Sequence, residues 1–405
     1  MKKIFTSALL ILFLLAACVP GDRPAVPTPT VVVNPPAAAQ NCTVTPHEYM
    51  AQGIPIPVAV VVNTPGVDGL SLFWKDGSPY GSWRTGSPLP VTKLHVATPT
   101  SGGVDAAPLI FLNSDESGVH LKLNQAGQIS NLIDFPAQVV VTSLMGVPSR
   151  STIAYSILQP SPDGVSLRTE IFVGDYTTIA SASPVLVVDS TESRYAIPLA
   201  IHRDANEKAN GVWYTFGLFG IGGDSMTDER KGLYYLDLST GEQTEFLSMG
   251  CQFSGLSIGQ NWATWFYNGS VHAADLHTGQ EIAYSLTRGN DRAAYASISP
   301  AEGYLAWLEG KGWGYDGTLD TILRIATLNG IILEEFPVSA FAEVSGLGAN
   351  IVIVPLGWMS PENENLLVAV IGASTDQSAL VYVDVNGGKL TPLLANGVFA
   401  GFAYP

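Results

Sequence analysis

The chain has 405 residues, of which 46% are hydrophobic and only 13% are charged, and its formal net charge is −16. This length suits one large domain or two ordinary ones. The negative charge repels phosphate backbones and so argues against binding to nucleic acid. Glycine (41) and proline (27) are abundant, which predicts many strands joined by tight turns rather than long solvated helices.

The first segment in chain order has the layout of an export signal. Two lysines precede an apolar run from Ala8 to Leu15, which is shorter than the ~20 residues that a membrane-spanning helix needs. The ending Leu15-Ala16-Ala17-Cys18 resembles the lipobox of bacterial lipoproteins. The resemblance implies that residues 1–17 are a signal peptide and that Cys18 becomes the lipidated N-terminus. An ordinary secretory signal with an incidental cysteine is the alternative.

Residues 18–42 form a linker rich in proline, alanine, threonine and valine. Proline stiffens such a segment into a semi-extended spacer, which would lift a folded domain away from a lipid surface. We therefore expect a protein of the bacterial cell envelope, held by lipid at the outer face of the cytoplasmic membrane, in the periplasm or at the outer membrane. Cys42 and Cys251 could pair in an exported protein or stay free, and the sequence leaves both open.

From residue 43 to residue 405 the chain reads as one domain of short strands. Residues 232–242, 271–281 and 380–389 share one plan, in which an alternating strand, a turn with glycine and a second strand follow each other. Glycine supplies the positive φ that hairpin turns need. These segments indicate a repeated hairpin unit.

The segment Leu109–Gly118, followed by the strand His120–Leu123, resembles the repeat of periplasmic TolB-type β-propellers, which carry PD40 or WD40-like repeats. The resemblance is good around residues 104–133, 232–286 and 297–394 and poor at 43–100 and 134–231. It implies a propeller that serves as a scaffold in the cell envelope. The lipobox and the lack of an evident separate N-terminal domain depart from that family, so membership of a Tol-like system is not implied.

Glycine spacing predicts the number of blades. The candidate turns between third and fourth strands lie at Gly77, Gly127, Gly174, Gly241, Gly279, Gly330 and Gly388. Their mean spacing is about 52 residues, and a four-stranded blade needs ~40–50 residues. We therefore predict an all-β fold, a β-propeller of about seven four-stranded blades, with six or eight left open. The C-terminal strand at 397–404 should close the ring beside the strand at 58–62. Two packed β-sandwiches are the alternative.

The sequence carries few signs of catalysis. Residues 255–259 match the G-x-S-x-G pattern around Ser257, but the residues that follow predict another strand, where a nucleophile elbow requires a helix. The six histidines have no usual metal-ligand spacing, and no phosphate-binding or dinucleotide-binding fingerprint is present. We expect no catalytic residue, no metal and no cofactor. A propeller lyase or hydrolase acting on a sugar or lactone stays open, as does calcium bound by hairpin carboxylates.

The hairpins between second and third strands should all emerge at one face of the ring. They carry Asp68, Asp115, Glu116, Asp163, Asp224, Asp228, Glu229, Asp316, Asp320 and Asp376. Such a face attracts cations or basic segments, although aspartate is also a common turn residue. Trp313 and Tyr315, flanked by glycine, are candidate binding anchors or rings folded back over a blade.

These observations predict a lipid-anchored extracytoplasmic propeller without catalytic activity. We expect a monomer that binds a protein, a peptide or an envelope polymer on its acidic face.

Overall fold

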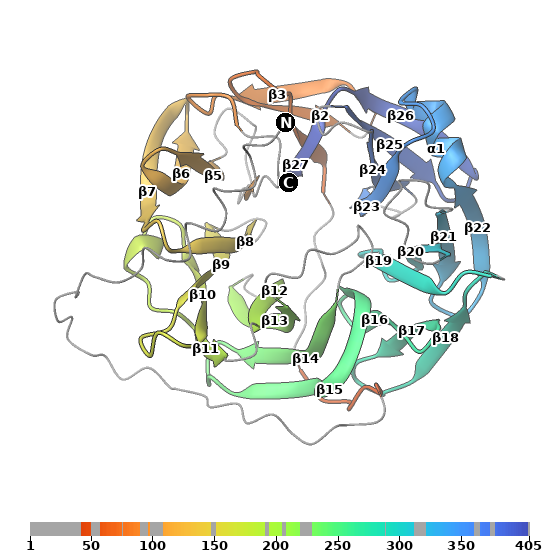
Figure 1. The fold of residues 1–405 in the computed structure, drawn as a ribbon, viewed down its shortest axis with the longest axis horizontal. Helices are drawn as coiled ribbons and strands as arrows, with labels where there is room; N and C mark the ends of the chain where they lie inside the picture. Colours follow the sequence, from red (N-terminus) through yellow and green to blue (C-terminus); the bar gives the residue numbers. More distant parts are fainter. Residues whose placement is uncertain are drawn as a thin grey trace, which may run out of the picture. The chain divides into compact units, whose positions relative to one another are not determined.

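The computed structural model describes most of the chain after residue 41. The described residues are 42–49, 57–74, 76–89, 96–97, 108–146, 151–190, 194–204, 208–218, 229–287, 289–311, 321–359, 365–372 and 377–403. They belong to the compact unit Val31–Pro405. Their elements are almost all strands, and Figure 1 shows the sheets placed around a ring, which is the arrangement of a β-propeller. Within these ranges no helix is both long and apolar enough to cross a membrane.

Five sheets of the described residues have four antiparallel strands, ordered from the centre of the ring outward (Figure 1). The first is β27 (Val398–Ala403), β1 (Ala59–Asn63), β2 (Leu70–Trp74) and β3 (Pro79–Trp83). The second is β4 (Val96–Ala97), β5 (Leu109–Asp115), β6 (Gly118–Gln125) and β7 (Gln128–Phe135). The third is β8 (Val140–Gly146), β9 (Thr152–Pro160), β10 (Leu167–Asp175) and β11 (Leu186–Ser190).

The two remaining four-stranded sheets lie nearest the C-terminus in chain order. One is β19 (Arg292–Ile298), β20 (Tyr304–Gly310), β21 (Ile322–Thr327) and β22 (Ile332–Pro337). The other is β23 (Val352–Met359), β24 (Asn365–Ile371), β25 (Ser378–Asp384) and β26 (Lys389–Ala395). Two short helices lie outside the sheets, η1 (Ile179–Ser181) and α1 (Val338–Ser345).

The blade count differs from the prediction. The other seven strands form one sheet in the order β12 (Arg194–Arg203), β13 (Ala209–Leu218), β14 (Arg230–Asp237), β15 (Gln243–Ile258), β16 (Trp262–Tyr267), β17 (Ser270–Asp275) and β18 (Glu281–Ser285). Strand β15 is 16 residues long and pairs with β14 as far as Phe253, then with β16 from Ser254 onward. The described residues therefore make five four-stranded blades, not about seven, because one strand runs on where the sequence suggested a break between blades.

The predicted closure of the ring is confirmed. Strand β27 pairs antiparallel with β1, with Ala403 opposite Ala59 and Val398 opposite Asn63. The Val58 amide also donates to the Ala403 carbonyl at 2.9 Å. Strand β1 is fully buried in this position, so joining the two ends of the chain also completes the core of the first blade.

Six of the seven candidate turn glycines lie in turns with positive φ, and Gly174 does not. Gly174 lies inside β10, opposite Ile153 of β9. A Cβ atom at Gly174 would lie 3.1 Å from Cδ1 of Ile179, so this glycine makes room for η1 instead of forming a turn. The turn predicted at Gly174 is wrong because glycine occurs both in turns and where two segments pack closely, and the sequence does not distinguish these two uses.

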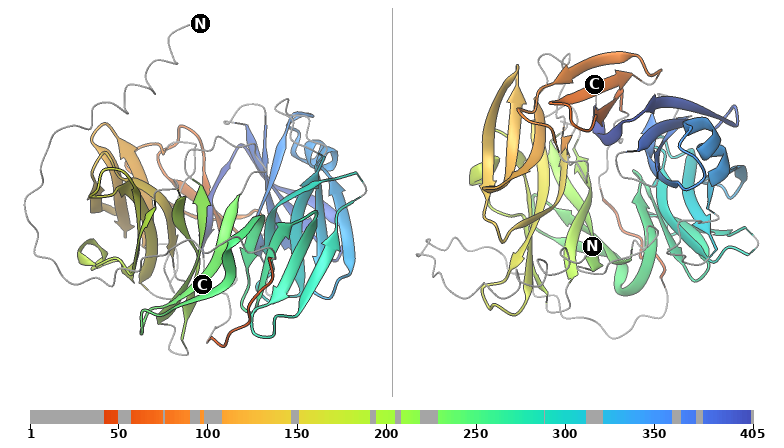
Figure 2. Two further views of the ribbon diagram at one scale, coloured as in Figure 1. Left: turned by 60° about the horizontal axis from the view of Figure 1, so that its bottom comes forward. Right: turned by 45° about the horizontal axis from the view of Figure 1, so that its top comes forward.

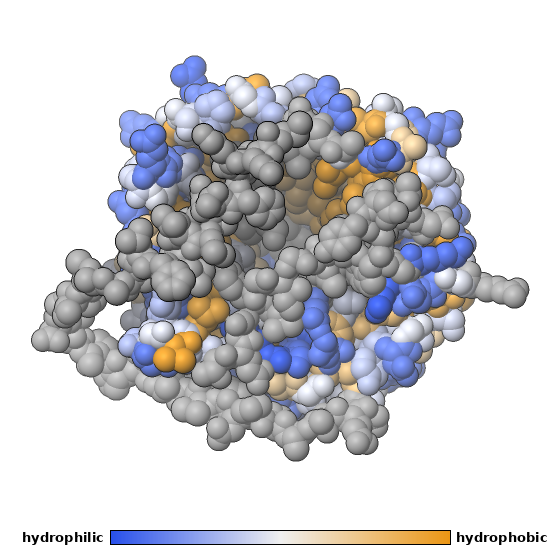
Figure 3. Space-filling model, in the orientation of Figure 1, coloured by the Kyte–Doolittle hydropathy of each residue, from blue (hydrophilic) through white to orange (hydrophobic). Residues whose placement is uncertain are grey.

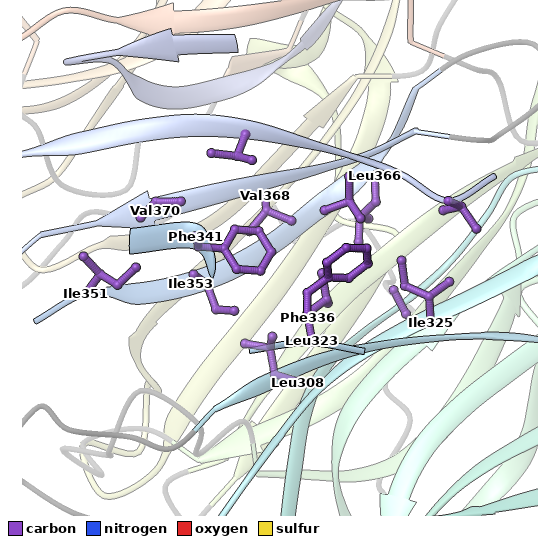
Figure 4. Packing of buried hydrophobic residues seen from close by; sticks show 14 of the residues in the cluster. Leu308, Leu323, Ile325, Phe336, Phe341, Ile351, Ile353, Leu366, Val368 and Val370 are labelled. Carbon is purple, nitrogen blue, oxygen red and sulfur yellow. The ribbon is translucent and has the colours of Figure 1, made fainter. Parts of the chain in front are cut away.

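The core is built from apolar faces between neighbouring sheets. Figure 4 shows Phe336 and Phe341 packed against Ile353, Leu366 and Val368, where α1 covers the last sheets. Phe341 is fully buried, which contributes roughly 1.5–3 kcal/mol. Figure 3 also shows apolar surface beside β23 and β24, near the centre of the ring.

Candidate functional site

The hairpins between second and third strands emerge at one end of the strands, as predicted from the repeat. We name this surface the hairpin face and define it by residues 64–69, 115–118, 161–166 and 268–269. Asp68, Asp115 and Asp163 lie on it. Glu116 lies on it as well, and Glu229 directly precedes β14. The remaining candidates of the predicted binding face, and Cys18, lie outside the described residues, namely Cys18, Asp224, Asp228, Trp313, Tyr315, Asp316, Asp320 and Asp376.

Two carboxylates of this face hydrogen-bond within the fold, Asp68 to the segment after β3 and Asp163 to its own hairpin. Oδ1 of Asp68 accepts from the amide and the hydroxyl of Thr85, both at 3.2 Å. Asp163 accepts from the amides of Val165 and Ser166 at 2.9 Å and from the Ser166 hydroxyl at 2.6 Å. The Ser166 hydroxyl and these amides lower the pKa of Asp163 to about 2. Asp163 therefore acts first as a turn residue.

Exposed valines are the feature of the hairpin face that sequence reasoning missed. Val165 is 84% exposed and Val67 is 50% exposed, and each lies within two residues of a hairpin aspartate. Val140, at the start of β8, is 46% exposed near the same end of the third blade. The sequence does contain a signal that could have identified Val67 and Val165. Valine favours strands, so a valine inside a turn is unusual.

The hairpin between β5 and β6 holds a network of four polar side chains. Ser117 Oγ lies 2.9 Å from His120 Nε2, and His120 Nδ1 lies 2.6 Å from Asp134 Oδ1. Asp115 Oδ1 lies 3.1 Å from His120 Nε2 and 2.5 Å from Ser117 Oγ. His120 and Asp134 are cross-strand partners on β6 and β7. The sequence alone did not indicate this pairing.

The charge state of His120 limits what this network can do. Asp134, and then Asp115, raise the pKa of His120, which favours the imidazolium form relative to a free imidazole. Ser117 lowers the pKa of Asp115 well below its usual range. The distances match a Ser-His-Asp arrangement, but a protonated histidine cannot take the proton of a serine hydroxyl.

The G-x-S-x-G pattern does not form a nucleophile elbow. Ser257 lies in β15 and pairs with Thr264 of β16, so a strand follows it instead of a helix. Its hydroxyl accepts from the Ile298 amide at 3.3 Å, which links β15 to β19.

A buried ion pair joins β20 to β21. Glu309, at the end of β20, is fully buried and accepts from the Thr287 amide at 2.9 Å and from Trp307 Nε1 at 3.2 Å. Arg324 on β21 lies 3.5 Å from the same carboxylate. Because Thr287 lies between β18 and β19, Glu309 links both β20 and β21 to the connection between those two strands.

Residues 42–49 form a second polar and aromatic region, which we name the strap. A disulfide joins Cys42 to Cys251 of β15, with a Cα–Cα distance of 5.1 Å. The Thr45 amide donates to the Phe246 carbonyl at 2.8 Å, and the His47 amide donates to the Leu276 carbonyl at 3.2 Å. Figure 2 shows the strap in red beside the green strands of the seven-stranded sheet. The strap therefore ties together the parts of this sheet on either side of β15.

The last residue of the strap, Tyr49, enters an aromatic cluster. Its ring stacks on His277 at 4.4 Å between centroids and on His202 at 5.5 Å. Trp213, Tyr235 and Phe246 lie around it with centroids 5.2 to 5.7 Å away. The Tyr49 hydroxyl donates to the Gln260 carbonyl at 2.7 Å, and burial raises its pKa well above the usual value.

His202 is the buried titratable group of this cluster. It is 3% exposed, and its Nε2 accepts from Trp213 Nε1 at 2.9 Å. Burial, helped by His277, lowers the pKa of His202 to about 4, so the ring is neutral at pH 7. Because Nε2 accepts, the proton is on Nδ1, which has no hydrogen-bond partner among the described residues.

The described residues contain no group of three or more histidine, cysteine, aspartate or glutamate side chains that could hold a metal ion.

Comparisons with known proteins show low similarity. Neither a family model nor a curated protein matches the chain. An oligogalacturonate lyase in complex with manganese is 11% identical over 84% of this chain and 85% of its own, with a TM-score of 0.45. TolB from Acinetobacter baumannii is 12% identical over 85% of this chain and 79% of its own, with a TM-score of 0.41.

Prolyl oligopeptidase B from Galerina marginata is 8% identical over 84% of this chain and 51% of its own, with a TM-score of 0.48. These proteins include enzymes and a TolB protein at comparable similarity. The propeller assignment therefore rests on the strand order of this chain, and its function has to be argued from its own residues.

Proposed function

We propose that this protein is a non-catalytic binding propeller of the bacterial cell envelope, anchored by lipid on Cys18. Its hairpin face would take a protein, a peptide or an envelope polymer. The observation that carries the proposal is Val165, which is 84% exposed at the tip of a hairpin that Asp163 holds in shape. Because its own hydrogen bonds already fix this hairpin, a partner could bury Val165 without the entropic cost of ordering a loop.

Charge favours a partner with basic groups. Glu116 is exposed on the hairpin between β5 and β6, and the chain as a whole carries a net charge of −16. Such a surface speeds the approach of positively charged partners and excludes anionic ones. A linker over residues 19–41 would span roughly 70 Å at ~3.1 Å per residue, enough to hold the ring clear of a membrane.

Cross-linking in native membranes tests the binding surface. We expect one dominant species to be captured by the wild-type protein and lost with Val165→Asp or Glu116→Lys. The matched control is Ile331→Asp, which changes a 56% exposed residue in the turn between β21 and β22, at the opposite end of the strands. Equal capture by Val165→Asp and wild type would remove the hairpin face from the proposal.

Membrane fractionation tests the anchor separately. Cys18→Ala should move the protein from the membrane fraction to the soluble fraction, because the lipid could no longer be attached. Retention of Cys18→Ala in the membrane would show that another part of the chain holds the protein there.

A hydrolase is the second candidate, and the Ser117, His120 and Asp134 distances favour it. Ser117 would be the nucleophile and His120 its general base once deprotonated. A fluorophosphonate probe should then label Ser117, with labelling that increases as pH rises above the raised pKa of His120. Absence of labelling at pH 9, with Ser117→Ala as the blank, would exclude this chemistry.

A further inference from the structure

We infer that the centre of the ring binds a long-chain fatty acid, with its acyl chain on apolar inner strands and its carboxylate at a cluster of arginines. We name this space the central channel and define it by the innermost strands β27, β4, β8, β12, β19 and β23 and by residues 254–258 of β15 (Figure 1). Figure 3 shows a hollow near the centre of the ring, with apolar surface beside β23 and β24. The site is separate from the hairpin face, and the inference does not rest on the proposed function.

The strands of the central channel lack the acidic residues that are common elsewhere in the chain. Among the described residues that define the channel there is no aspartate or glutamate, although the chain has 35 of them. The outermost strands, by contrast, carry Asp134, Asp189, Glu281, Glu334 and Glu335. The channel walls therefore do not themselves repel an anionic ligand, even though the net charge of the chain is −16.

The inner strands carry apolar bulges near their middle. Six of the seven segments that define the channel shift register there against their neighbouring strand. A β-bulge adds a residue and re-aims its side chain, and bulges are common next to functional sites. In four of the six segments the added residues include a large apolar side chain, namely Leu199, Leu256, Tyr295 and Leu356. All four are partly exposed although they lie on innermost strands, so their exposed parts face the channel.

Arginines lie at the ends of this apolar wall. The described inner strands carry three arginines and no lysine, and the three are Arg194, Arg203 and Arg292, each at a strand end. Arg194 and Arg292 begin β12 and β19, opposite the last residues of β13 and β20, so both lie at the end of the strands that bears the hairpin face. Arg203 lies at the other end of β12. Asp291 precedes Arg292, but successive residues of an extended chain point to opposite sides.

Arg230 of β14 adds a third guanidinium group to the same mouth of the channel. It lies opposite Gly217 of β13, which in turn lies opposite Tyr195 of β12. A Cβ atom at Gly217 would lie 2.8 Å from Nη1 of Arg230 and 3.4 Å from Cε1 of Tyr195. The side chain of Arg230 therefore crosses β13 over this glycine toward the innermost strand, which a side chain at position 217 would prevent.

Strand β15 places Arg230 close to Arg292. Phe253 lies opposite Arg230, and the next residue, Ser254, donates its hydroxyl to the Ala293 carbonyl at 2.9 Å. Arg292 directly precedes Ala293 and therefore lies at the same level of the ring. The arginines at this mouth also interact within the chain, so a ligand shares groups that the fold already holds.

An apolar wall with a cluster of guanidinium groups at one end fits an amphiphile with one anionic end. At ~3.3 Å per residue, the strand advances roughly 17 Å from Arg194 to Leu199 and roughly 10 Å from Arg292 to Tyr295. A long acyl chain covers this distance and a short one does not. A guanidinium group pairs with a carboxylate through two parallel hydrogen bonds, which fixes the head group at the mouth.

The test uses the full chain with Cys18→Ala, so that no attached lipid takes part, and dansyl-undecanoic acid as a fluorescent probe. We expect one probe molecule to bind per chain, with displacement by dodecanoate but not by dodecanol, which lacks the charge, or by butyrate, which lacks the length. Arg230→Gln should weaken binding roughly 10-fold or more, because it removes a charged hydrogen-bond donor. The matched control Arg203→Gln, at the opposite end of the strands, should bind as the parent does.

Leu356→Gln tests the apolar wall and should weaken binding with little change in the melting temperature. If this variant does not fold, the affinity of the parent for butyrate, octanoate and dodecanoate tests the same wall, since it should increase with chain length. Equal affinity for dodecanol and dodecanoate, or no dependence on chain length, would overturn the inference. Equal weakening by Arg203→Gln and Arg230→Gln, or a parent that does not bind the probe, would overturn it as well.

Discussion

The pKa values of two buried histidines, His120 and His202, are shifted in opposite directions by their surroundings. His120 lies between Asp134 and Asp115 near the hairpin face, and both carboxylates raise its pKa. His202 lies among aromatic rings beside the strap, and burial lowers its pKa to about 4. The comparison teaches that the surroundings of a histidine decide its pKa in this ring, since two carboxylates raise the pKa of His120 and burial lowers that of His202.

The largest expected effect comes from opening the strap region. Cys42→Ala/Cys251→Ala removes a cross-link between positions 209 residues apart, which the chain-entropy model values at about 5 kcal/mol. Urea unfolding should show this loss in the variant and in the reduced wild type alike. The network around His120 should be unaffected, so its NMR titration is the internal control. An unchanged urea midpoint would mean that the strap contributes little to stability.

Tyr49→Ala tests how far the strap keeps His202 neutral. Tyr49 is partly buried, so loss of its ring should cost about 2–3 kcal/mol of unfolding free energy, less than the ~3–5 kcal/mol of a fully buried ring. Water entering the space that the ring leaves should raise the pKa of His202 from about 4 toward 6.5, because burial is its main cause. The control Tyr49→Phe keeps the ring and loses only the hydrogen bond to Gln260. A pKa of His202 that stays near 4 in Tyr49→Ala would show that the strap is not what excludes water.

The pH dependence of stability should follow His202. Its pKa is lower in the folded state than the ordinary 6.5, so the unfolded chain binds more protons between these values. Stability should therefore fall as pH drops from about 6.5 to about 4, by about 3 kcal/mol. Urea unfolding at pH 7 and pH 4.5 measures the fall. His202→Gln should abolish it while keeping an acceptor for Trp213, and a fall of equal size in His202→Gln would assign it to other groups.

The smallest effect is expected at His120. The pKa of His120 is higher in the folded state than in the unfolded chain, so protonation of His120 stabilises the fold. This stabilisation is fully present below the pKa of the unfolded chain, and it is lost as pH rises through the pKa of the folded state. Asp134→Asn should lower the pKa of His120 toward 6.5, and Asp115→Asn should lower it less, because Asp134 is the larger cause. An NMR titration of the His120 ring distinguishes the two variants. Equal shifts would contradict this ranking.

The candidate site was only partly predictable from the sequence. The repeat placed Asp68, Asp115 and Asp163 on hairpins at one end of the strands, because strand alternation decides which end a turn occupies. It could not show that Asp163 hydrogen-bonds its own turn while Val165 points into solvent. Nor could it pair His120 with Asp134, whose contact depends on the register between β6 and β7.

By itself the sequence determined the all-β character, six of the seven turn glycines and the closing strand. These features depend on backbone preferences of adjacent residues and on alternation within single strands, so a short stretch of sequence is enough to predict them. The tertiary structure alone decided that β15 continues between two expected blades, that Gly174 makes room for Ile179 and that Cys42 lies beside Cys251. Each of these depends on segments far apart in the chain, which only the closing of the ring brings together.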